Sequence, residues 1–485
     1  MWHRAPSPLG IILSGGLVSG CATVPRHAGF PDVAKTVEAR TGLHIQRYTG
    51  TPERAVTMAI GSLLRDKLAV EEAMQIALLN NRSLQATLEE LGVARADAIQ
   101  ASLLTNPIFS GHLRFPDKPA STDVEFALAQ SVLDALFIPL RKKVAVMQFE
   151  QAKLQVSDSI LGFIAEVKAA YYTAQAAEQV HAMRLTVLQA AEAAAELAQR
   201  QYTAGNIKDI DLANEQAAYH QAQVELVRSE AELTAAREAL NRLLGLSGEQ
   251  ATTWRVAAAL PDLPAADPAR DDLESLALNQ RLDLAAARKD AEALRQRLSV
   301  IRFGPLATPD LGVSSETEEG NRVTGPIWEA AIPIFDWGQA DISRVKARLR
   351  QREHQLAAQE VAVHAEIRTL SDRLVAQRRI VERYRAHVLP LRQQIVASSQ
   401  RHYNYMLIGA FQLLQAKQQE ITARQEYIEA LRDYWIARAQ LEAAVGGKLP
   451  MVTASPEAPA QPAGEAEFQP QEVPQEDHGH HHGGE

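Results

Sequence analysis

The chain of 485 residues has one cysteine, few aromatic residues and no excess of positive charge. A single cysteine excludes an intrachain disulfide and argues against a cysteine-based metal cluster. The formal net charge of −9 excludes the basic surface on which nucleic-acid binding depends. No run of about 18 apolar residues follows the N-terminal stretch, so no transmembrane helix is expected. Alanine, leucine, glutamine and glutamate dominate instead, which favours long helices.

Residues 1–20 have the pattern of an export signal peptide, with His3 and Arg4 ahead of an apolar stretch too short to span a membrane. The stretch ends in Val18-Ser19-Gly20-Cys21, which resembles the bacterial lipobox, whose cysteine is lipidated and becomes the first mature residue. Acyl chains on Cys21 would anchor the protein to a membrane. The alternative is a signal peptide cleaved elsewhere and a chance cysteine. Residues 21–66 have no strong period and are expected to pack outside the helices.

The rest of the chain contains an internal repeat of about 200 residues, which is the first feature to settle in any fold prediction. Eight residues match at an offset of 201: Arg200, Tyr202, Ile207, Leu212, Glu225, Arg237, Leu240 and Gly245 with Arg401, Tyr403, Ile408, Leu413, Glu426, Arg438, Leu441 and Gly446. The predicted domains are residues 67–246 and 272–447, joined by a proline-containing connector at 247–271. A tail at 448–485, rich in Pro, Ala, Glu and Gln, is predicted to be disordered.

Each repeat is predicted to hold a very long helical hairpin. Large apolar residues recur every seven positions after Gly205, which is typical of coiled-coil packing: Leu212, Tyr219, Leu226, Leu233 and Leu240. Helices from Pro139 to about Tyr202 and from Gly338 to about Tyr403 would each span roughly 90 Å. Pro390 is expected to kink or interrupt the second. A shorter helix from Leu68, with a break near Asn80, precedes the first hairpin.

Alternating residues between the helices predict two strand hairpins, near 107–130 and near 309–335. In the first hairpin Phe109, Gly111, Leu113 and Phe115 share one face, and Val124, Phe126 and Leu128 share one face of the next strand. In the second hairpin Leu311 and Val313 alternate with polar residues, and a polar loop is expected at 316–324. Strands of about ten residues with one apolar face fit membrane β-strands, although a soluble hairpin is the alternative.

Four strands cannot close a barrel, and open strand edges are not tolerated in lipid. Several copies of the chain would therefore have to pool their strands and helices. The predicted fold class is mainly α with a small β part: two repeats of coiled-coil helices plus one membrane β-hairpin each, in a homo-oligomeric tube.

This order of helix, strand hairpin, long helix, Tyr-x-x-Gly turn and long helix resembles the TolC family of outer-membrane channel proteins. The resemblance implies a homotrimer, with a twelve-stranded barrel in outer-membrane lipid and a helical tunnel in the periplasm of a Gram-negative bacterium. It implies work with a periplasmic adaptor and an inner-membrane transporter of the resistance-nodulation-division type. The adaptor would contact the hairpin turns at Tyr202, Gly205, Asn206, Ile207, Tyr403, Met406, Leu407 and Ile408.

In some members of that family acidic residues just past the second turn ring the closed end of the tunnel. The matching positions here are Gln412 and Gln415, so the resemblance does not imply a strong anionic gate. Asp209 and Asp211 are the other candidates for the tunnel entrance. The alternative is that both are solvated carboxylates at a helix N-terminus, where the helix dipole favours them.

No catalytic constellation occurs in the sequence, so an enzyme is not expected and no cofactor is required. The C-terminal tail carries four imidazoles, which are ligands for Zn²⁺, Cu²⁺ or Ni²⁺: His478, His480, His481 and His482. They predict weak metal binding unless they are an affinity tag. With the Met406-Leu407-Ile408-Gly409 turn, the tail makes the chain similar to the heavy-metal branch of the family.

The predicted function is a passive outer-membrane exit channel of a tripartite pump that exports heavy-metal cations or drugs. Two alternatives remain open at this point. One is the same duct used for type I secretion of proteins or peptides, and the other is a periplasmic coiled-coil scaffold without a pore.

Overall fold

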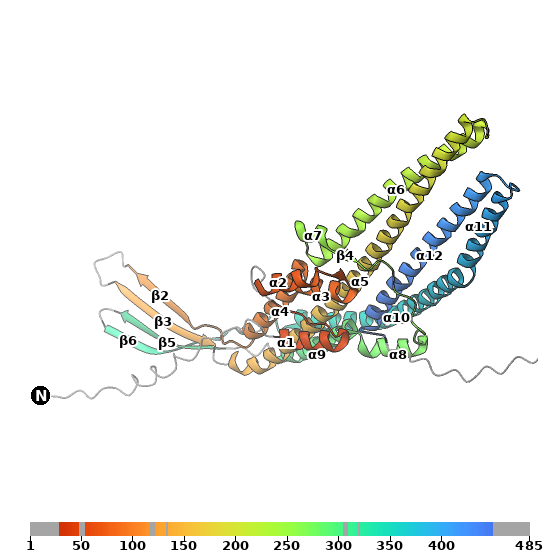
Figure 1. Ribbon diagram of the computed structural model, residues 1–485. Coiled ribbons are helices and arrows are strands. Elements are labelled where there is room, and N and C mark those ends of the chain that lie inside the picture. Colours follow the sequence, from red (N-terminus) through yellow and green to blue (C-terminus); the bar gives the residue numbers. More distant parts are fainter. Residues whose placement is uncertain are drawn as a thin grey trace, which may run out of the picture.

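The computed structural model describes residues 29–47, 54–115, 122–131, 134–303, 309–318, 321–330, 332 and 334–449. It is elongated: a small sheet stands at one end, two helical hairpins stand at the other, and shorter elements cover the middle (Figure 1). Cys21 and the four histidines of the tail lie outside the described residues, and so do the predicted signal peptide and nearly all of the predicted tail.

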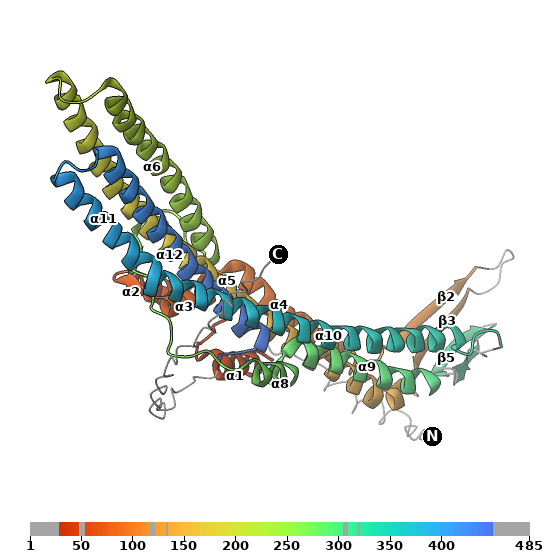
Figure 2. The ribbon, with the colours of Figure 1, turned by 90° about the vertical axis from the view of Figure 1, so that its right-hand side faces the viewer.

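The repeat predicted from the sequence is present as two successive sets of elements. The first set is α3 (Val70–Asn80), α4 (Arg82–Gln100), β2 (Ile108–Arg114), β3 (Asp123–Ser131), α5 (Asp134–Thr203) and α6 (Asp209–Leu244). The second set is α8 (Arg270–Gln280), α9 (Leu282–Phe303), β5 (Asp310–Glu318), β6 (Asn321–Glu329), α10 (Gln339–Arg383), η2 (Tyr384–Val388), α11 (Leu389–Asn404) and α12 (Ala410–Val445). Figure 2 shows the two hairpins side by side with their turns at the same end.

The break predicted near Asn80 separates α3 from α4 and has a counterpart between α8 and α9. Asn81 caps α4 by accepting the Leu84 N–H at 3.0 Å, and its amide donates to the Leu243 carbonyl at the end of α6 at 2.9 Å. Arg281, 200 positions later, donates to the Ala444 carbonyl at the end of α12 at 3.2 Å. Both side chains therefore satisfy a helix end that would otherwise lack a partner.

The long helices differ between the repeats. Helix α5 has 70 residues and begins at Asp134, five positions before the predicted start at Pro139, because a proline is tolerated near a helix start. The second repeat has the predicted interruption instead: the π-helical turn η2 separates α10 from α11. The Leu389 N–H donates to the Tyr384 carbonyl there, directly before Pro390, which has no N–H to donate.

A continuous row of buried residues in each hairpin lies three positions beyond the predicted leucine row. In α6 it is Glu215, Ala222, Ser229, Ala236 and Leu243. In α12 the equivalent residues are Ala416, Ala423, Ala430, Ala437 and Ala444. Most of these side chains are small, which lets two helices approach closely, so this row is buried at every position, whereas in α6 only Leu240 of the leucine row is fully buried. The seven-residue period was predicted correctly, but this small-residue seam was missed.

The middle of the molecule is where the peripheral segments pack. Helices α1 (Phe30–Thr41) and α2 (Arg54–Leu63) lie outside the hairpins, as predicted for this segment. The connector is more ordered than predicted: it forms α7 (Glu249–Thr253) and β4 (Arg255–Val256), and β4 pairs in parallel with β1 (Lys67–Leu68). Residues 67–68 are thus a strand, and the helix predicted from Leu68 starts at Val70.

Polar contacts of Trp254 and Asp267 help to fix the connector to the long helices. Trp254 is fully buried and donates its indole N–H to Asn241 of α6 at 2.7 Å. Asp267 accepts from Arg378 of α10 at 2.7 Å and from Arg438 of α12 at 3.0 Å. The connector therefore binds both hairpins at the level of the core, which locks the two repeats together.

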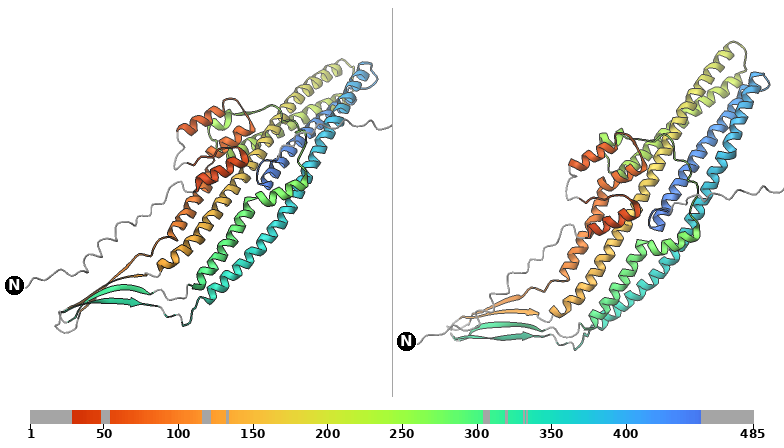
Figure 3. Two further views of the ribbon diagram at one scale, coloured as in Figure 1. Left: turned by 90° about the horizontal axis from the view of Figure 1, so that it is seen from below. Right: turned by 60° about the horizontal axis from the view of Figure 1, so that its bottom comes forward.

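The four remaining strands form one antiparallel sheet in the order β2-β3-β5-β6 (Figure 3). The strands have seven to nine residues, slightly fewer than predicted. The polar loop predicted at 316–324 was wrong. Most of it is strand, and Glu318 pairs with Asn321 across the turn. The polar residues misled the prediction because they belong to the ends of two paired strands and not to a loop.

Candidate channel surfaces

The sheet has one apolar face, which we call the apolar band: Phe109, Leu113, Val124, Phe126, Leu128, Leu311, Val313, Pro326 and Trp328. The strand registers place these residues on the same side, with Leu128 opposite Phe109 on one neighbour and Val313 on the other. Phe109 and Phe126 stack with ring centroids 5.8 Å apart. Phe109 is 69% exposed and Trp328 74% exposed, so none of the described residues covers these side chains. A contiguous exposed apolar face marks contact with lipid or with another protein.

The opposite face of the sheet carries charge. Arg114 on β2 donates to Glu125 on β3 at 3.2 Å and to Glu316 on β5 at 3.1 Å, so one guanidinium bridges two strands. Ile108, Val323 and Ile327 are the apolar exceptions on this side. One apolar and one polar face is the pattern of a strand between lipid and water.

The two outer strands of this sheet, β2 and β6, each have only one neighbour among the described strands. Unpaired backbone groups cannot be left in lipid, so a sheet of this kind needs further strands to close it. Between the sheet and α10, the side chains of Phe335 and Trp337 are 89% and 65% exposed. Aromatic side chains at this level fit the interfacial belt expected beside a membrane span.

The first helical turn follows the predicted geometry. Gly205 has φ of 77°, its N–H donates to the Tyr202 carbonyl at 2.9 Å, and the Asn206 N–H donates to Gln201 at 2.8 Å. Glycine is favoured at this place because only a residue without a Cβ enters the left-handed region freely. Ile207 is half-buried behind the turn.

The second turn repeats this geometry with a different residue. Met406, at the position equivalent to Gly205, has φ of 58°, and its N–H donates to the Tyr403 carbonyl at 2.9 Å. Gly409 has φ of −80° and is instead the residue that caps the start of α12. Met406 is 93% exposed and Leu407 is 69% exposed, whereas Ile408 is half-buried. The turn therefore presents an apolar tip to solvent.

The four tunnel-entrance candidates lie near these turns, and two of them have a local structural role. Asp211 accepts the Lys208 N–H at 3.3 Å, and Gln412 accepts the Gly409 N–H at 2.9 Å. These are equivalent capping interactions at the starts of α6 and α12. Asp209 and Gln415 are exposed. The capping interaction of Asp211 agrees with the alternative, a carboxylate at a helix N-terminus. The prediction that Asp211 lies at the tunnel entrance remains untested.

A groove of about 790 Å³ lies between the ends of the two hairpins. Asp211, Tyr403 and Gln412 line it, so the structure brings together candidates from both repeats. Glu215 also lines it and is only 7% exposed. Sequence reasoning missed Glu215, although the repeat offset could have found it, because Ala416 occupies the equivalent position.

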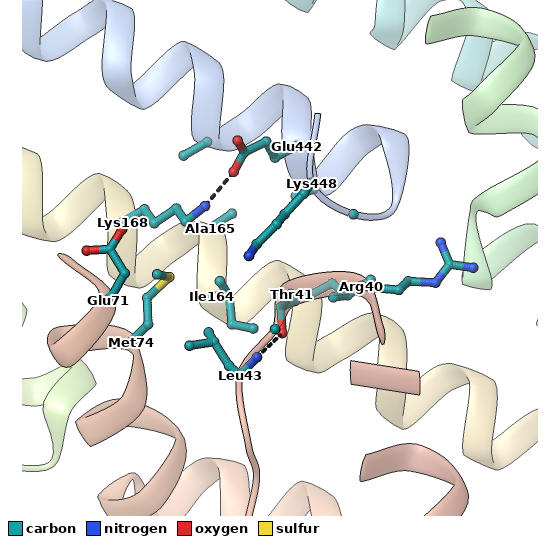
Figure 4. A pocket seen from close by; sticks show the side chains of 15 residues that line it. Arg40, Thr41, Leu43, Glu71, Met74, Ile164, Ala165, Lys168, Glu442 and Lys448 are labelled. Atoms are coloured by element: carbon teal, nitrogen blue, oxygen red, sulfur yellow. Dashed lines mark hydrogen bonds and ion pairs between the residues drawn. The ribbon is translucent and has the colours of Figure 1, made fainter. Parts of the chain in front are cut away.

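A second pocket, of about 300 Å³, lies in the middle of the molecule between α1, α3, α5 and α12 (Figure 4). Lys168 of α5 forms an ion pair with Glu442 of α12 across it. The Leu43 N–H donates to the Thr41 hydroxyl at 3.2 Å on its floor. The pocket therefore lies where helix α1 and helix α3 meet the long helices α5 and α12.

The described residues hold neither a helix fit to cross a membrane nor a cluster suited to a metal ion. None of the helices there combines the length and apolar character that a membrane crossing requires. No group of three or more His, Cys, Asp or Glu side chains suited to a metal ion occurs in that part of the chain.

Residues 140–246, which contain nearly all of the first hairpin, match the family model described as outer membrane efflux protein. Over these residues the chain is similar to this family. The family consists of channels without enzymatic activity. The cobalt-zinc-cadmium resistance protein CzcC of Cupriavidus metallidurans is 22% identical over 391 residues, which cover 78% of this chain and 90% of that protein.

Solved structures share the fold over most of the chain. A membrane protein from Pseudomonas aeruginosa superposes with a TM-score of 0.66 at 20% identity, covering 78% of this chain and 92% of that one. The CmeC outer membrane channel of Campylobacter jejuni gives a TM-score of 0.68 at 14% identity, with coverages of 84% and 95%. CusC gives a TM-score of 0.62 at 17% identity, with coverages of 84% and 98%. The predicted fold class and the resemblance to the TolC family are confirmed.

Proposed function

We propose that this protein is the passive outer-membrane exit channel of a tripartite efflux pump. One observation carries the proposal: an uncovered apolar band and two open strand edges stand at one end of the molecule, and long helical hairpins project from the other. The apolar face of this sheet is stable in lipid, and its edge strands find hydrogen-bond partners there only after the sheet closes. The hairpins then extend into the periplasm.

Closure requires several chains. Three copies of four strands give twelve, an even number within the range of outer-membrane barrels. The charged face, with Arg114, Glu125 and Glu316, would then line the water-filled interior. A homotrimer is also what the resemblance to the TolC family implies.

The partners and the cargo belong to the same proposal. A periplasmic adaptor would bind the two hairpin turns, where Met406 and Leu407 expose apolar surface. A transporter of the resistance-nodulation-division type would select the cargo. The name of CzcC supports heavy-metal cations as that cargo. Secretion of proteins or peptides and a scaffold without a pore are the alternatives that the experiment below separates.

The two ends of the chain add two smaller proposals. Lipid on Cys21 would anchor the trimer in the outer membrane, and radiolabelled palmitate incorporation that is lost in Cys21→Ser tests this. The histidines at 478–482 would bind Zn²⁺, Cu²⁺ or Ni²⁺ weakly. Calorimetric titration of the full chain and of a chain ending at Pro450 tests the tail, and equal heats would refute it.

The main test measures conductance of the purified full-length protein in planar lipid bilayers. A channel is expected to give discrete conductance steps, and their complete absence would favour the scaffold. Deletion of the gene then separates the cargoes: sensitivity to Co²⁺, Zn²⁺ and Cd²⁺ is expected to rise while secreted protein levels stay unchanged. The reverse pattern would favour secretion.

A further inference from the structure

The buried seams of α6 and α12 differ at one position that packing does not explain. The row in α12 consists of five alanines, all buried. In α6 the position equivalent to Ala416 holds Glu215, at the offset of 201 that relates the hairpins. The same backbone position therefore carries a methyl group in the second hairpin, at Ala416, and a carboxylate in the first, at Glu215.

Glu215 has no compensating partner among the described residues. Only 7% of Glu215 is exposed, and its carboxylate has no hydrogen bond or ion pair among the described residues, so its remaining access is to the groove that it lines. Asp211 lies one helical turn away and carries the same charge. Burial, and then the charge of Asp211, raise the pKa of Glu215 above its usual value. A buried carboxylate without a partner destabilises a fold, so a positive ligand would relieve it.

The groove beside Glu215 offers further oxygen atoms. Asn214 and Asp211 come from the same helix, Gln201 comes from α5, and Tyr403 and Gln412 come from the other hairpin. Carboxylate, amide and hydroxyl oxygens suit hard divalent cations, which also retain water ligands. The groove is large enough to hold such a hydrated ion.

We propose that the groove binds a divalent metal cation, with Glu215 as its buried anionic ligand and Asp211 as a second carboxylate. Neutral oxygens of the facing hairpin complete the site, so the bound ion joins the two hairpins near their turns. The site does not depend on which cargo the channel exports.

The test uses Mn²⁺ alone, because this ion prefers oxygen ligands and discriminates against the histidine tail. Free Mn²⁺ is measured by electron paramagnetic resonance during titration of the full-length protein in detergent. One ion per subunit is expected, with a dissociation constant on the order of 0.1–1 mM. Glu215→Ala and Glu215→Gln are both expected to weaken binding about tenfold or more.

Glu215→Ala keeps the fold testable, because it recreates the small side chain that α12 has at the equivalent position. Glu230→Ala, at an exposed position of the same helix, is the matched control and is expected to bind Mn²⁺ like the wild type. Equal Mn²⁺ affinity in the wild type and in Glu215→Ala would overturn the proposal. Loss of Mn²⁺ binding in the control would overturn it too. Neither result would affect channel conductance, so the proposed function is tested separately.

Discussion

Single residues show where the two repeats depart from each other. Met406 holds the left-handed conformation that Gly205 holds in the first turn, which costs a residue with a Cβ about 1–2 kcal/mol. The exposed apolar tip is thus kept at the expense of local strain. The hydrogen bonds of the turn and the two adjacent helices hold Met406 in this conformation. Strained residues held in this way are common at functional sites.

A second residue, Asp158 of α5, couples the repeats through charge. It faces Arg281 and Asp283 at the start of α9 and Glu366 of α10, and it accepts the backbone N–H of Asp283. Burial, and then the charge of Asp283, raise the pKa of Asp158 to about 6. Arg281 pairs with Asp283 at 2.8 Å and with Glu366 at 2.5 Å, so Asp158 is the surplus carboxylate of this cluster.

Asp158→Asn is therefore expected to stabilise the protein by about 1–2 kcal/mol above pH 6.5, after allowance for the exposed part of the side chain. Because the folded-state pKa is raised, the penalty of ionisation is fully present above about 6 and disappears below the unfolded value near 4. Thermal unfolding followed by circular dichroism across pH 4–8 measures the difference. Asp97→Asn, at an exposed site, is the control, and a wild-type-to-variant difference independent of pH would contradict the prediction.

At the scale of elements, the two long helices respond differently to proline. Pro139 lies in the second turn of α5, where few backbone bonds are lost, and the helix continues for 70 residues. Pro390 lies well inside the second long helical stretch and has no N–H to donate to the preceding turn. The chain accommodates the lost hydrogen bond by forming the π-helical turn at Tyr384–Val388. The side chain of Tyr384 donates to Glu426 of α12 at 2.9 Å, which ties the interruption to the partner helix.

Pro390→Ala is expected to restore a continuous α-helix and to stabilise the hairpin by about 1–3 kcal/mol, because an interior proline removes a hydrogen bond and crowds the preceding turn. Hydrogen exchange of the amides at 384–392 measures the local effect. Pro139→Ala is the matched comparison and is expected to gain less. Unchanged exchange in Pro390→Ala would show that the interruption has another cause.

At the scale of the whole molecule, the single chain is incomplete. Its helices and connector form a shared core, but within the described residues its sheet has an uncovered apolar band and unpaired edges. Closure of the sheet with strands of other copies, inside lipid, would both cover the apolar band and pair the strand edges.

Leu128→Arg is expected to prevent insertion, because it places a charge in the centre of the apolar band at about 2–4 kcal/mol per subunit. Ala127→Arg, one residue away on the charged face, is expected to insert normally. Outer-membrane fractionation and the yield of heat-sensitive oligomer on SDS gels measure both. Equal insertion of the two variants would contradict the assignment of the faces.

The sequence alone determined the repeat, the long hairpins, the break at Asn81 and the interruption near Pro390, because periodicity, glycine and proline act locally. It also placed the first strand hairpin, whose faces alternate cleanly. Only the tertiary structure decided where β6 begins, that the connector forms α7 and β4, and that Glu215 is buried. Those depend on which faces meet across distant segments: strand pairing turned a polar stretch into β5 and β6, and close helix approach buried the row of mostly small residues three positions beyond the leucine row.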